Sequence, residues 1–432
     1  MRVSARIAAP VVALALAGLT ATGCAPSTDD GGAKKDEKSG TLRVWLFREV
    51  NNKPKQDVVS DVVAKFRESH DDVKVDVQYI PVDSRAEKIK GALNDPDSAP
   101  DVIEFGNTDT AGYVADGGLA DISKEFGAWA EAKDTDPTAK QSVTVDGKIY
   151  GAPLFVGVRA LYYRTDVFED LDLKAPETLD EVASAAREIR AERPEMYGLM
   201  VGGAYTYGAM PFIWAHGGEL ATEKGGDFTA AIDSDAAQKG IKAYTDLFGK
   251  DNCPPSNCAQ MTGNDNVEAF ASGKAGMALG GDFNRQAMDD GAVSGKYAVV
   301  PLPGVKKGEI APGFAGGNNV GVMKSTSHRS LAVDLVEQLA GKETQERLFQ
   351  EMGFLPTFSD TRKKVAAEEP FVAPFVKTLE AGAKFVPASP GWAKIDAGMV
   401  LPTMFQQVVS GKKDVADASE GAAQQMDEAF AQ

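Results

Sequence analysis

The sequence predicts an α/β protein of two domain-sized units, each a mainly parallel sheet flanked by helices. Strand-like and helix-like segments alternate along the chain, as a parallel sheet with helical crossovers requires. The chain is also long, because about 390 residues follow the N-terminal segments, and a single hydrophobic core rarely serves so many. These two observations together favour two α/β units.

The first unit is predicted from hydrophobic periodicity. Its elements follow in this order: a strand at 42–47, a helix at 57–66, a strand at 73–79, a helix at 86–93, a strand at 102–105 and a helix at 108–116. Within the first helix, one face carries Val58, Val59, Val62, Val63 and Phe66. Ligands bind beyond the carboxyl ends of parallel strands, so the loops 48–52 and 106–109 are candidate site loops.

A second α/β unit begins in the middle of the chain. Strand-like runs lie at 148–155, 160–164 and 197–201, with a helix at 179–191. Helices are expected to dominate the end of the chain, at 330–340, 343–351, 374–381, 400–409 and 415–430.

Residues 1–23 have the layout of a secretory signal peptide. Arg2 and Arg6 precede an apolar run, Ile7 to Leu19, that is short for a membrane span. The small residues before Cys24 resemble the bacterial lipobox, although that motif prefers Leu where this chain has another residue. We expect Cys24 to be the first mature residue and to carry lipid chains, with an ordinary secretory signal as the alternative.

Residues 24–40 are expected to be a lipidated, flexible tether. The stretch after Cys24, APSTDDGGAKKDEKSG, has no aromatic or branched apolar residue. Nothing after it approaches the length of a membrane-spanning segment. The body of the protein is therefore expected on the outer face of the bacterial cell membrane.

Charge and cysteine content narrow the function further. The formal net charge of −17 would repel a phosphate backbone, so no nucleic-acid partner is expected, and solubility is the ordinary account of this charge. Outside the cell, Cys253 and Cys258 predict a disulfide that closes a short loop and adds modest stability. A metal site would need further ligands that are missing nearby.

Motifs of common enzyme classes are absent from the sequence. No two glycines are separated by a single residue, no Gly-Lys pair precedes Ser or Thr, and no G-x-S-x-G or H-E-x-x-H occurs. The three histidines, His70, His216 and His328, are far apart. No catalytic residue and no cofactor is predicted, although numerous carboxylates leave a glycosidase pair open.

Several stretches together resemble family 1 extracellular solute-binding proteins, the carbohydrate-binding lipoproteins of ABC importers. The likeness covers nearly the whole mature chain. It rests on LRVWLF at Leu42, APDVIEFGNTDTAGYVADGGLADI at Ala99, GKIYGAPLFVGVRALYYRTDVF at Gly147, HGGEL at His216, FASGKAGMALGGDFN at Phe270, GFLPT at Gly353, and GWAKID followed by MFQQVVSGKKDVADA. The order and spacing of these stretches carry the resemblance.

The resemblance implies two lobes joined by a hinge that closes on a sugar. The N-terminal lobe would comprise 41–155 plus 312–356, and the C-terminal lobe 156–311 plus 357–432. It also implies membrane permease subunits as partners, and we expect a monomer. The ligand expected by resemblance is a chitobiose-like or α-glucoside di- or oligosaccharide.

Sugar rings stack on aromatic faces, and their hydroxyls need paired donors and acceptors. Trp392 matches the position where maltodextrin-type relatives place a stacking aromatic, with a buried core tryptophan as the alternative. Asp282, Phe283 and Asn284 occupy a segment where the family puts a turn and an aromatic, although many relatives have Trp at the position of Phe283. Asp282 could equally cap the following helix.

Further candidates follow strand ends or loops. Arg48 and Glu49 follow the first strand, and Asn107 and Asp109 follow the third, where Asp109 could instead cap a helix. Tyr205 and Tyr207 lie in a Gly-rich segment expected to display aromatics on a flexible loop. Arg159 precedes the run Leu161 to Tyr163 and is a further candidate, with an ion pair at the hinge as its alternative.

The function predicted is therefore that of a non-enzymatic sugar-binding protein. An extracellular glycoside hydrolase is the rival class, and it would need two carboxylates about 5–10 Å apart. A binder of peptides or other solutes on the same lipoprotein plan is the third hypothesis. Few histidines and thiols count against a metal ligand, and the mixture of aromatic, acidic and amide residues favours sugar.

Overall fold

The computed structural model describes residues 36–49, 51–81, 84–95 and 98–431, and the part from Asp36 onward forms one compact unit. The predicted signal peptide, Cys24 and the tether up to residue 35 lie outside the described residues.

The end of the predicted tether contacts the folded body. The Glu37 N–H donates to the Ser327 carbonyl at 2.7 Å, and the Asp36 carboxylate accepts from the Ser330 N–H at 3.1 Å. Gly40 already belongs to the first strand. The expectation of a flexible segment through residue 40 is therefore wrong for residues 36–40, because these hydrogen bonds and the start of β1 hold them.

The first sheet contains β1 (Gly40–Phe47), β2 (Val73–Ile80), β3 (Val102–Gly106), β6 (Ala152–Gly157) and β13 (Gly316–Val322) in the order β2-β1-β3-β13-β6. Strands β2 and β3 both pair with β1 in parallel, as the strand-helix alternation predicted. Strand β13 runs antiparallel to both β3 and β6. Strands β2, β1, β3 and β6 therefore run in one direction, so this sheet is mainly parallel, as predicted, with β13 as its antiparallel strand.

The second sheet contains β7 (Arg159–Arg164), β8 (Tyr197–Met200), β11 (Ala275–Gly281) and β12 (Tyr297–Val300) in the order β12-β7-β11-β8. Only β11 and β8 pair in parallel among these described strands, while β7 is antiparallel to both of its neighbours. Strands β12, β11 and β8 therefore run in one direction and β7 runs against them, so the prediction of a mainly parallel second sheet is confirmed, with β7 as the exception. Strand β7 follows β6 directly, so no helical crossover sets its direction.

Two short hairpins lie outside these sheets: β4 (Thr144–Val145) with β5 (Lys148–Ile149), and β9 (Ala221–Lys224) with β10 (Asp227–Ala230).

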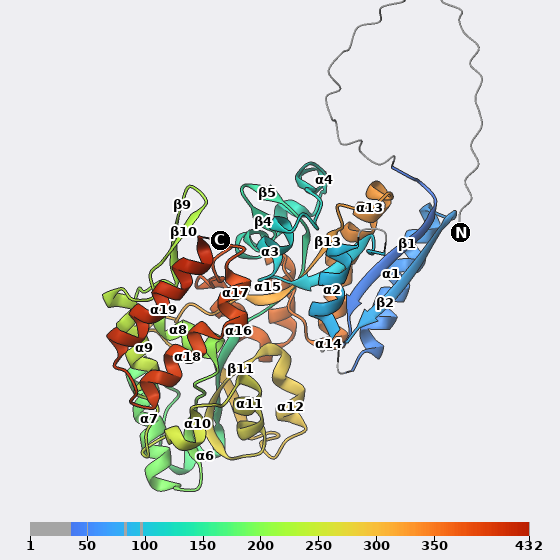
Figure 1. Cartoon of the computed structure of the whole chain (residues 1–432). Coiled ribbons are helices and arrows are strands. Elements are labelled where there is room, and N and C mark those ends of the chain that lie inside the picture. Colours follow the sequence, from blue (N-terminus) through green and yellow to red (C-terminus); the bar gives the residue numbers. More distant parts are fainter. Residues whose placement is uncertain (1–35, 50, 82–83, 96–97, 432) are drawn as a thin grey trace, which may run out of the picture. The chain divides into compact units, whose positions relative to one another are not determined.

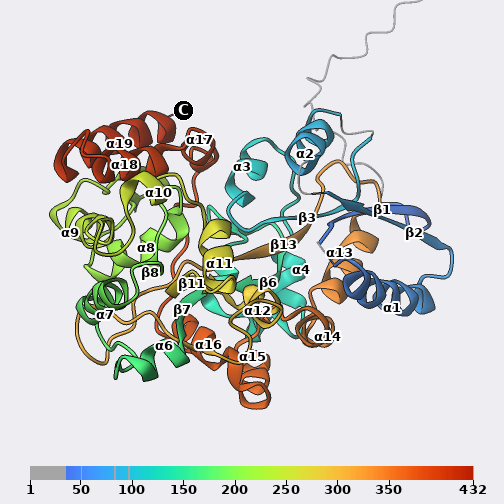
Figure 2. The same cartoon turned by 90° about the horizontal axis from the view of Figure 1, so that it is seen from below.

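Helices cover both sheets. Those of the first two thirds of the chain are α1 (Lys53–Ser69), α2 (Arg85–Asn94), α3 (Thr110–Ala115), α4 (Ser123–Ala128), α5 (Pro137–Gln141), α6 (Thr165–Asp170), α7 (Leu179–Glu192), α8 (Thr206–Ala215), α9 (Asp235–Thr245), α10 (Pro255–Cys258), α11 (Gly263–Ala271) and α12 (Arg285–Asp289). Helix α1 buries Val58, Val59, Val62 and Phe66, so the predicted apolar face is confirmed there. It packs against α13 and α14, as Figure 2 shows.

Helices dominate the last third, as predicted. They are α13 (Arg329–Leu339), α14 (Lys342–Met352), α15 (Ser359–Glu368), α16 (Ala373–Glu380), α17 (Trp392–Ala397), α18 (Val400–Val409) and α19 (Val415–Phe430). In Figure 1, the last three lie together at the C-terminal end of the chain, and α19 contacts both α17 and α18.

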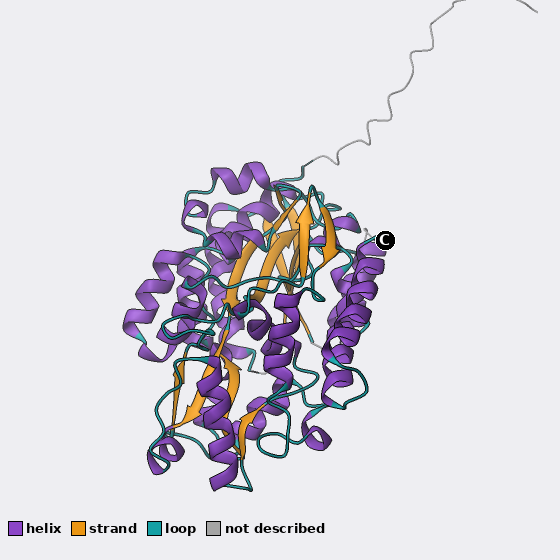
Figure 3. Ribbon diagram, turned by 90° about the vertical axis from the view of Figure 1, so that its left-hand side faces the viewer, coloured by secondary structure: helices purple, strands orange, loops and turns teal. Residues whose placement is uncertain are grey.

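The chain passes between the two sheets at closely spaced points. Only Val158 separates β6 of the first sheet from β7 of the second, and the chain returns from β12 to β13. Each sheet has its own large apolar cluster: Leu42, Val44 and Val102 belong to one, and Leu161, Leu199 and Met277 to the other. Figure 3 shows the strands of both sheets flanked by helices. Polar loops at the crossing are thus held between two rigid cores.

Candidate functional site

A cavity of about 540 Å³ lies where the two sheets meet. Elements of both sheets line it, which follows from the crossing of the chain at Val158. Its lining residues are Glu49, Asn51, Pro54, Arg85, Gly106, Asn107, Thr108, Phe155, Val156, Gly157, Arg159, Tyr207, Asp282, Phe283, Gln286, Phe314, Gly316, Gly317, Asn318, Glu351, Met352 and Phe354. We call it the crossing cavity. A neighbouring cavity of about 560 Å³ shares Asp282 and Phe283 with it.

Aromatic rings form much of the wall of the crossing cavity. Phe155 and Phe354 stack with ring centroids 4.2 Å apart, and Tyr207 and Phe314 stack at 4.4 Å. Phe283 is 48% exposed, which is unusual for a phenylalanine in a folded core. Exposed ring faces of this kind offer apolar platforms to a ligand.

Arg159 lies among these rings. Its guanidinium carbon is 5.3 Å from the Tyr207 centroid, 5.9 Å from that of Phe283 and 6.0 Å from that of Phe314. Its Nε donates to the Tyr205 hydroxyl at 2.8 Å. Among the described residues, the close contacts of Arg159 are these rings and Tyr205 rather than an ion pair at the hinge, although its charge acts to lower the pKa of Asp282. A cation among ring faces is favourable, and here it holds the aromatic wall together.

Asp282 ties the second sheet to the crossing. Its Oδ1 accepts from the Val158 N–H at 3.0 Å, and the residue is only 4% exposed. Burial raises its pKa to about 7, although the N–H of Val158 opposes the shift. The helix-cap alternative is wrong for Asp282, because the cap position belongs to Gly281, whose N–H is accepted by the Asn284 side chain at 2.7 Å. Asn284 is absent from the cavity lining.

Of the four residues predicted at the ends of the first and third strands, two line the crossing cavity and two do not. Glu49 and Asn107 line the crossing cavity, whereas Arg48 and Asp109 are not among its lining residues. The Asn107 side chain donates to the Ala315 carbonyl at 3.0 Å, which ties β3 to the segment that enters β13. The Arg48 carbonyl accepts from the Arg85 guanidinium at 2.8 Å.

Asp109 has a second carboxylate in its surroundings. Burial raises its pKa to about 6, and the negative charge of Asp396 on α17 adds to the shift. Burial also raises the pKa of Asp396. Asp109 stands at the N-cap position of α3, but its side chain makes no capping hydrogen bond. The carboxylate is therefore not engaged in the capping role considered from the sequence.

The structure corrects the surroundings predicted for the tyrosines. Tyr205 precedes α8 and Tyr207 lies within it, so neither is displayed on a flexible loop. Tyr205 is 5% exposed, and its hydroxyl donates to the Leu279 carbonyl at 3.2 Å. Tyr207 is the one of the two that lines the cavity. The signal that sequence reasoning missed was the segment TYGAMPFIWA, which carries no charged residue and is buried along most of its length as α8.

Trp392 lies at the start of α17 and is 2% exposed within the apolar cluster of the second sheet. Its indole nitrogen is buried without a hydrogen-bond partner among the described residues. It is absent from the lining of the crossing cavity. The structure therefore places this ring in the core, which was the alternative to a stacking platform.

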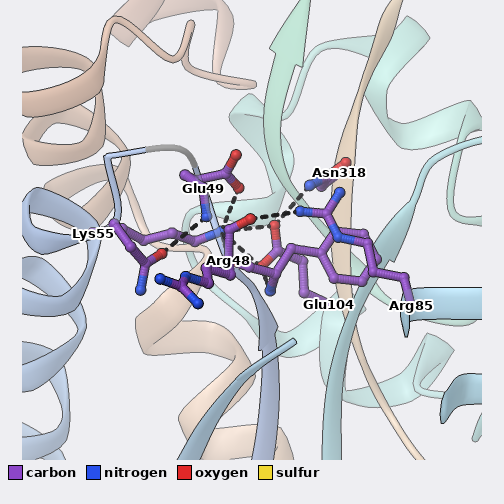
Figure 4. A network of polar contacts seen from close by, with 8 residues as sticks. Arg48, Glu49, Lys55, Arg85, Glu104 and Asn318 are labelled. Carbon is purple, nitrogen blue, oxygen red and sulfur yellow. Dashed lines mark hydrogen bonds and ion pairs between the residues drawn. The ribbon is translucent and has the colours of Figure 1, made fainter. Parts of the chain in front are cut away.

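A buried polar network beneath the cavity was also missed. Lys55 and Glu104 are 1% and 0% exposed in their side chains, and their charged atoms approach to 2.9 Å. Figure 4 shows them with Glu49 and Asn318, both of which line the cavity. The sequence contained a signal for this network, because Glu104 lies inside the apolar run VIEFG and a charge in a buried strand requires a partner.

The disulfide predicted between Cys253 and Cys258 is present. Both cysteines are fully buried, and neither lines the crossing cavity. Among the described residues, no group of three or more His, Cys, Asp or Glu is placed to hold a metal ion.

Comparison with known proteins identifies the family to which this chain is similar. Residues 52–346 match the family described as bacterial extracellular solute-binding protein. The diacetylchitobiose binding protein DasA of Streptomyces coelicolor is 26% identical over 95% of this chain and 96% of its own. The galactooligosaccharide-binding protein of Bacillus subtilis is 25% identical over 94% of this chain and 93% of its own.

A solved structure has the same fold. It is an ABC transporter solute binding protein of Thermotoga lettingae bound with α-D-tagatose, with a TM-score of 0.75 and 26% identity. The alignment covers 91% of this chain and 100% of that one.

Proposed function

This chain belongs to the family of bacterial extracellular solute-binding proteins, and from that premise we propose that it captures a di- or oligosaccharide for an ABC importer. Members of this family are binding proteins of transport systems, so this protein is a binding protein and not an enzyme. The observation that carries the proposal is the crossing cavity, whose stacked aromatic pairs stand beside carboxylate, amide and guanidinium groups. Ring faces suit the C–H faces of a pyranose, and the polar groups suit its hydroxyls.

The proposed ligand is a chitobiose-like sugar or an α-glucoside. Two relatives of nearly full length are named for diacetylchitobiose and for galactooligosaccharide, which supports a short oligosaccharide. The neighbouring cavity that shares Asp282 and Phe283 offers room for a second ring.

The proposed contacts come from the cavity lining. We assign stacking to Phe283, Tyr207 and Phe155, and hydrogen bonding to Glu49, Asn107 and Arg159. Arg48, Asp109, Asp282, Asn284 and Tyr205 are proposed to support the site from its edge. Trp392 is assigned to the core.

The proposed mechanism is hinge closure around the ligand, followed by docking of the closed form on a permease. The proposed lobes are 41–155 plus 312–356 and 156–311 plus 357–432, and the protein is proposed to act as a monomer. The crossing at Val158, where strands of the two sheets are one residue apart, supports a hinge at this place.

The family is extracellular, so the protein is exported. We propose that the signal peptide 1–23 directs this export and that lipid on Cys24 anchors the protein. Within the part of the chain that the structure describes, no helix has the length and apolar character needed to cross a bilayer.

A thermal-shift screen tests the proposal. The panel contains diacetylchitobiose, maltose, maltotriose, a galactooligosaccharide and, as non-sugar controls, di- and tripeptides. A sugar at 100 times its dissociation constant should add about 2.7 kcal/mol to the free energy of unfolding. Stabilisation by peptides alone would contradict the proposal. Chromatography of each sugar after incubation should show no cleavage, and cleavage would favour a hydrolase.

A further inference from the structure

The side chain of Lys55 is buried on α1 with every donor engaged. Its ammonium group donates to the Phe47 carbonyl at 3.0 Å, to Glu49 Oε1 at 3.1 Å and to both Glu104 oxygens at 2.9 and 3.0 Å. A lysine has three N–H donors, so these three acceptor groups account for all of them. The contacts join the end of β1, the following loop and β3, as Figure 4 shows.

Glu104 is equally engaged. Besides Lys55, its Oε2 accepts from the Phe47 N–H at 2.8 Å and its Oε1 accepts from the Asn318 amide at 2.7 Å. Asn318 lies on β13, the strand by which the chain returns from the second sheet. Glu104 thus connects the returning strand to the lysine, and neither of its oxygens faces the cavity unpaired.

Glu49 differs from Glu104 in one respect. Its Oε1 accepts from Lys55, whereas no described residue donates to its Oε2, and that oxygen is not among the buried unpaired atoms. Its side chain is 25% exposed, and the residue lines the crossing cavity. One oxygen is therefore held from below while the other stays accessible.

The charges of the three groups explain why the accessible oxygen lies on Glu49. One cation stands between two carboxylates, so the set carries one net negative charge. A buried charge is costly unless it is paired and hydrogen-bonded, and Glu104 has both kinds of partner. The excess negative charge therefore falls on Glu49, which water or a ligand can reach.

We propose that Lys55 and Glu104 are positioning residues that hold the Glu49 carboxylate at the cavity wall, with one oxygen presented to hydroxyl donors of the ligand. The proposal rests on the proposed sugar-binding function. It assigns to the free oxygen of Glu49 the acceptance of a hydrogen bond from a sugar hydroxyl, because a charged carboxylate is a strong acceptor. It assigns to Lys55 and Glu104 no contact with the ligand.

A set of variants tests this. Lys55→Met/Glu104→Gln removes both buried charges together and avoids leaving one of them unpaired. Glu49→Gln removes the proposed contact, and the triple variant combines all three changes. Affinity is measured by calorimetry with diacetylchitobiose, maltotriose and a galactooligosaccharide, and the melting temperature is measured on the same samples.

We expect Glu49→Gln and Lys55→Met/Glu104→Gln each to weaken binding about tenfold or more, and the triple variant to bind no more weakly than the weaker of these two. Non-additivity of this kind is expected when groups act as one unit. The proposal would be overturned if the fold-loss of affinity in the triple variant equalled the product of the losses in the other two variants. Unchanged affinity in the double variant would also overturn it.

Hydrogen exchange without ligand provides an independent arm. Amides of residues 47–56 should exchange faster in the double variant, with little change elsewhere, and unchanged exchange there would overturn the proposal. If the wild-type protein binds none of the three sugars, the proposed function fails. The exchange measurement still tests whether Lys55 and Glu104 hold the segment that carries Glu49.

Lys342→Met is the matched control. Lys342 also pairs with two carboxylates, Asp134 at 2.7 Å and Asp360 at 2.6 Å, but it does not line the crossing cavity. Its loss should leave sugar affinity unchanged within twofold. An affinity loss equal to that of the double variant would show a general effect of removing lysines and would overturn the proposal.

Discussion

Single residues around the crossing cavity owe their chemistry to burial. Asp282 is 4% exposed, and burial raises its pKa although the N–H groups of Val158 and of Asp282 itself act to lower it. Phe283, the next residue, is 48% exposed. Two adjacent residues thus provide a buried carboxyl group and an exposed ring. Mutation of Asp282 should therefore change stability, and mutation of Phe283 should change ligand binding.

The pH dependence of stability should report on Asp282. Its folded-state pKa of about 7 lies above the value of 3.8 for a free side chain, so the folded state binds the proton more tightly. Its contribution to the free energy of unfolding is complete below about pH 4 and falls until about pH 7. Asp282→Asn keeps an acceptor for the Val158 N–H and removes the titration. The variant should match wild type near pH 4 and exceed it above pH 7, by at most about 4 kcal/mol.

Urea denaturation at pH 4.5, 6 and 8 measures this difference. Asp290→Asn is the control, because Asp290 is exposed on the same segment. Parallel pH profiles for wild type and Asp282→Asn would contradict the buried, titrating carboxyl group.

Phe283 and Trp392 should separate ligand binding from core packing. Phe283→Ala should weaken sugar binding about tenfold, because stacking is lost, while stability changes by less than about 0.5 kcal/mol. Trp392→Ala should cost about 3–5 kcal/mol of stability, because the ring is in the core. Trp392→Phe should cost less, since the buried indole N–H has no partner to lose.

Melting temperature and affinity are measured on the same samples of these variants. Unchanged affinity in Phe283→Ala would remove Phe283 from the proposed site. A stable Trp392→Ala protein that no longer binds sugar would restore the stacking role of the tryptophan.

At the scale of elements, short connections position the cavity wall. The segment before α8 is held by the disulfide loop, since the Gly203 N–H donates to the Cys258 carbonyl at 3.1 Å and the Ala204 N–H to the Met261 carbonyl at 3.1 Å. Helix α8 then carries Tyr207 to the cavity. The disulfide therefore supports a site element at a distance, although its sulfur atoms are in the core.

Removing the disulfide should lower stability and barely affect binding. Closing so short a loop contributes about 2 kcal/mol in the chain-entropy account. Cys253→Ala/Cys258→Ala should therefore unfold at lower denaturant concentration, with sugar affinity within about threefold of wild type. Alanine is preferred to serine, because a hydroxyl would be buried without a partner. Loss of binding in a folded variant would show that the loop shapes the site directly.

At the scale of the whole molecule, export and attachment decide where the cavity works. The formal net charge of −17 gives no attraction to an anionic membrane surface, so attachment depends on the N-terminal segment. The proposed anchor is lipid on Cys24.

Cys24→Ala should release the protein from the membrane. Expressed in a bacterium with its own signal peptide, the variant should appear in the medium or the soluble envelope fraction, with unchanged sugar affinity after purification. Metabolic labelling with a fatty acid should mark wild type and not the variant. Equal recovery of both proteins in membranes would contradict lipid anchoring.

The sequence by itself determined the elements and their order. Periodicity located α1, α7, α18 and α19, because apolar residues spaced for one helical face are a local signal. It also predicted the parallel pairing of β1 with β2 and β3, and the Cys253–Cys258 disulfide. Family motifs supplied the two-sheet plan and the solute-binding family.

Only the tertiary structure decided which side chains meet at the cavity. The direction of β7 and β13 depends on where the chain crosses between sheets, which periodicity does not encode. Phe155, Phe314 and Phe354 come from distant segments, so local patterns could not group them. Burial decided the rest: Trp392 and Phe283 are both aromatic residues near glycines in the sequence, but packing buries one and leaves the other exposed, because each position depends on neighbours far along the chain.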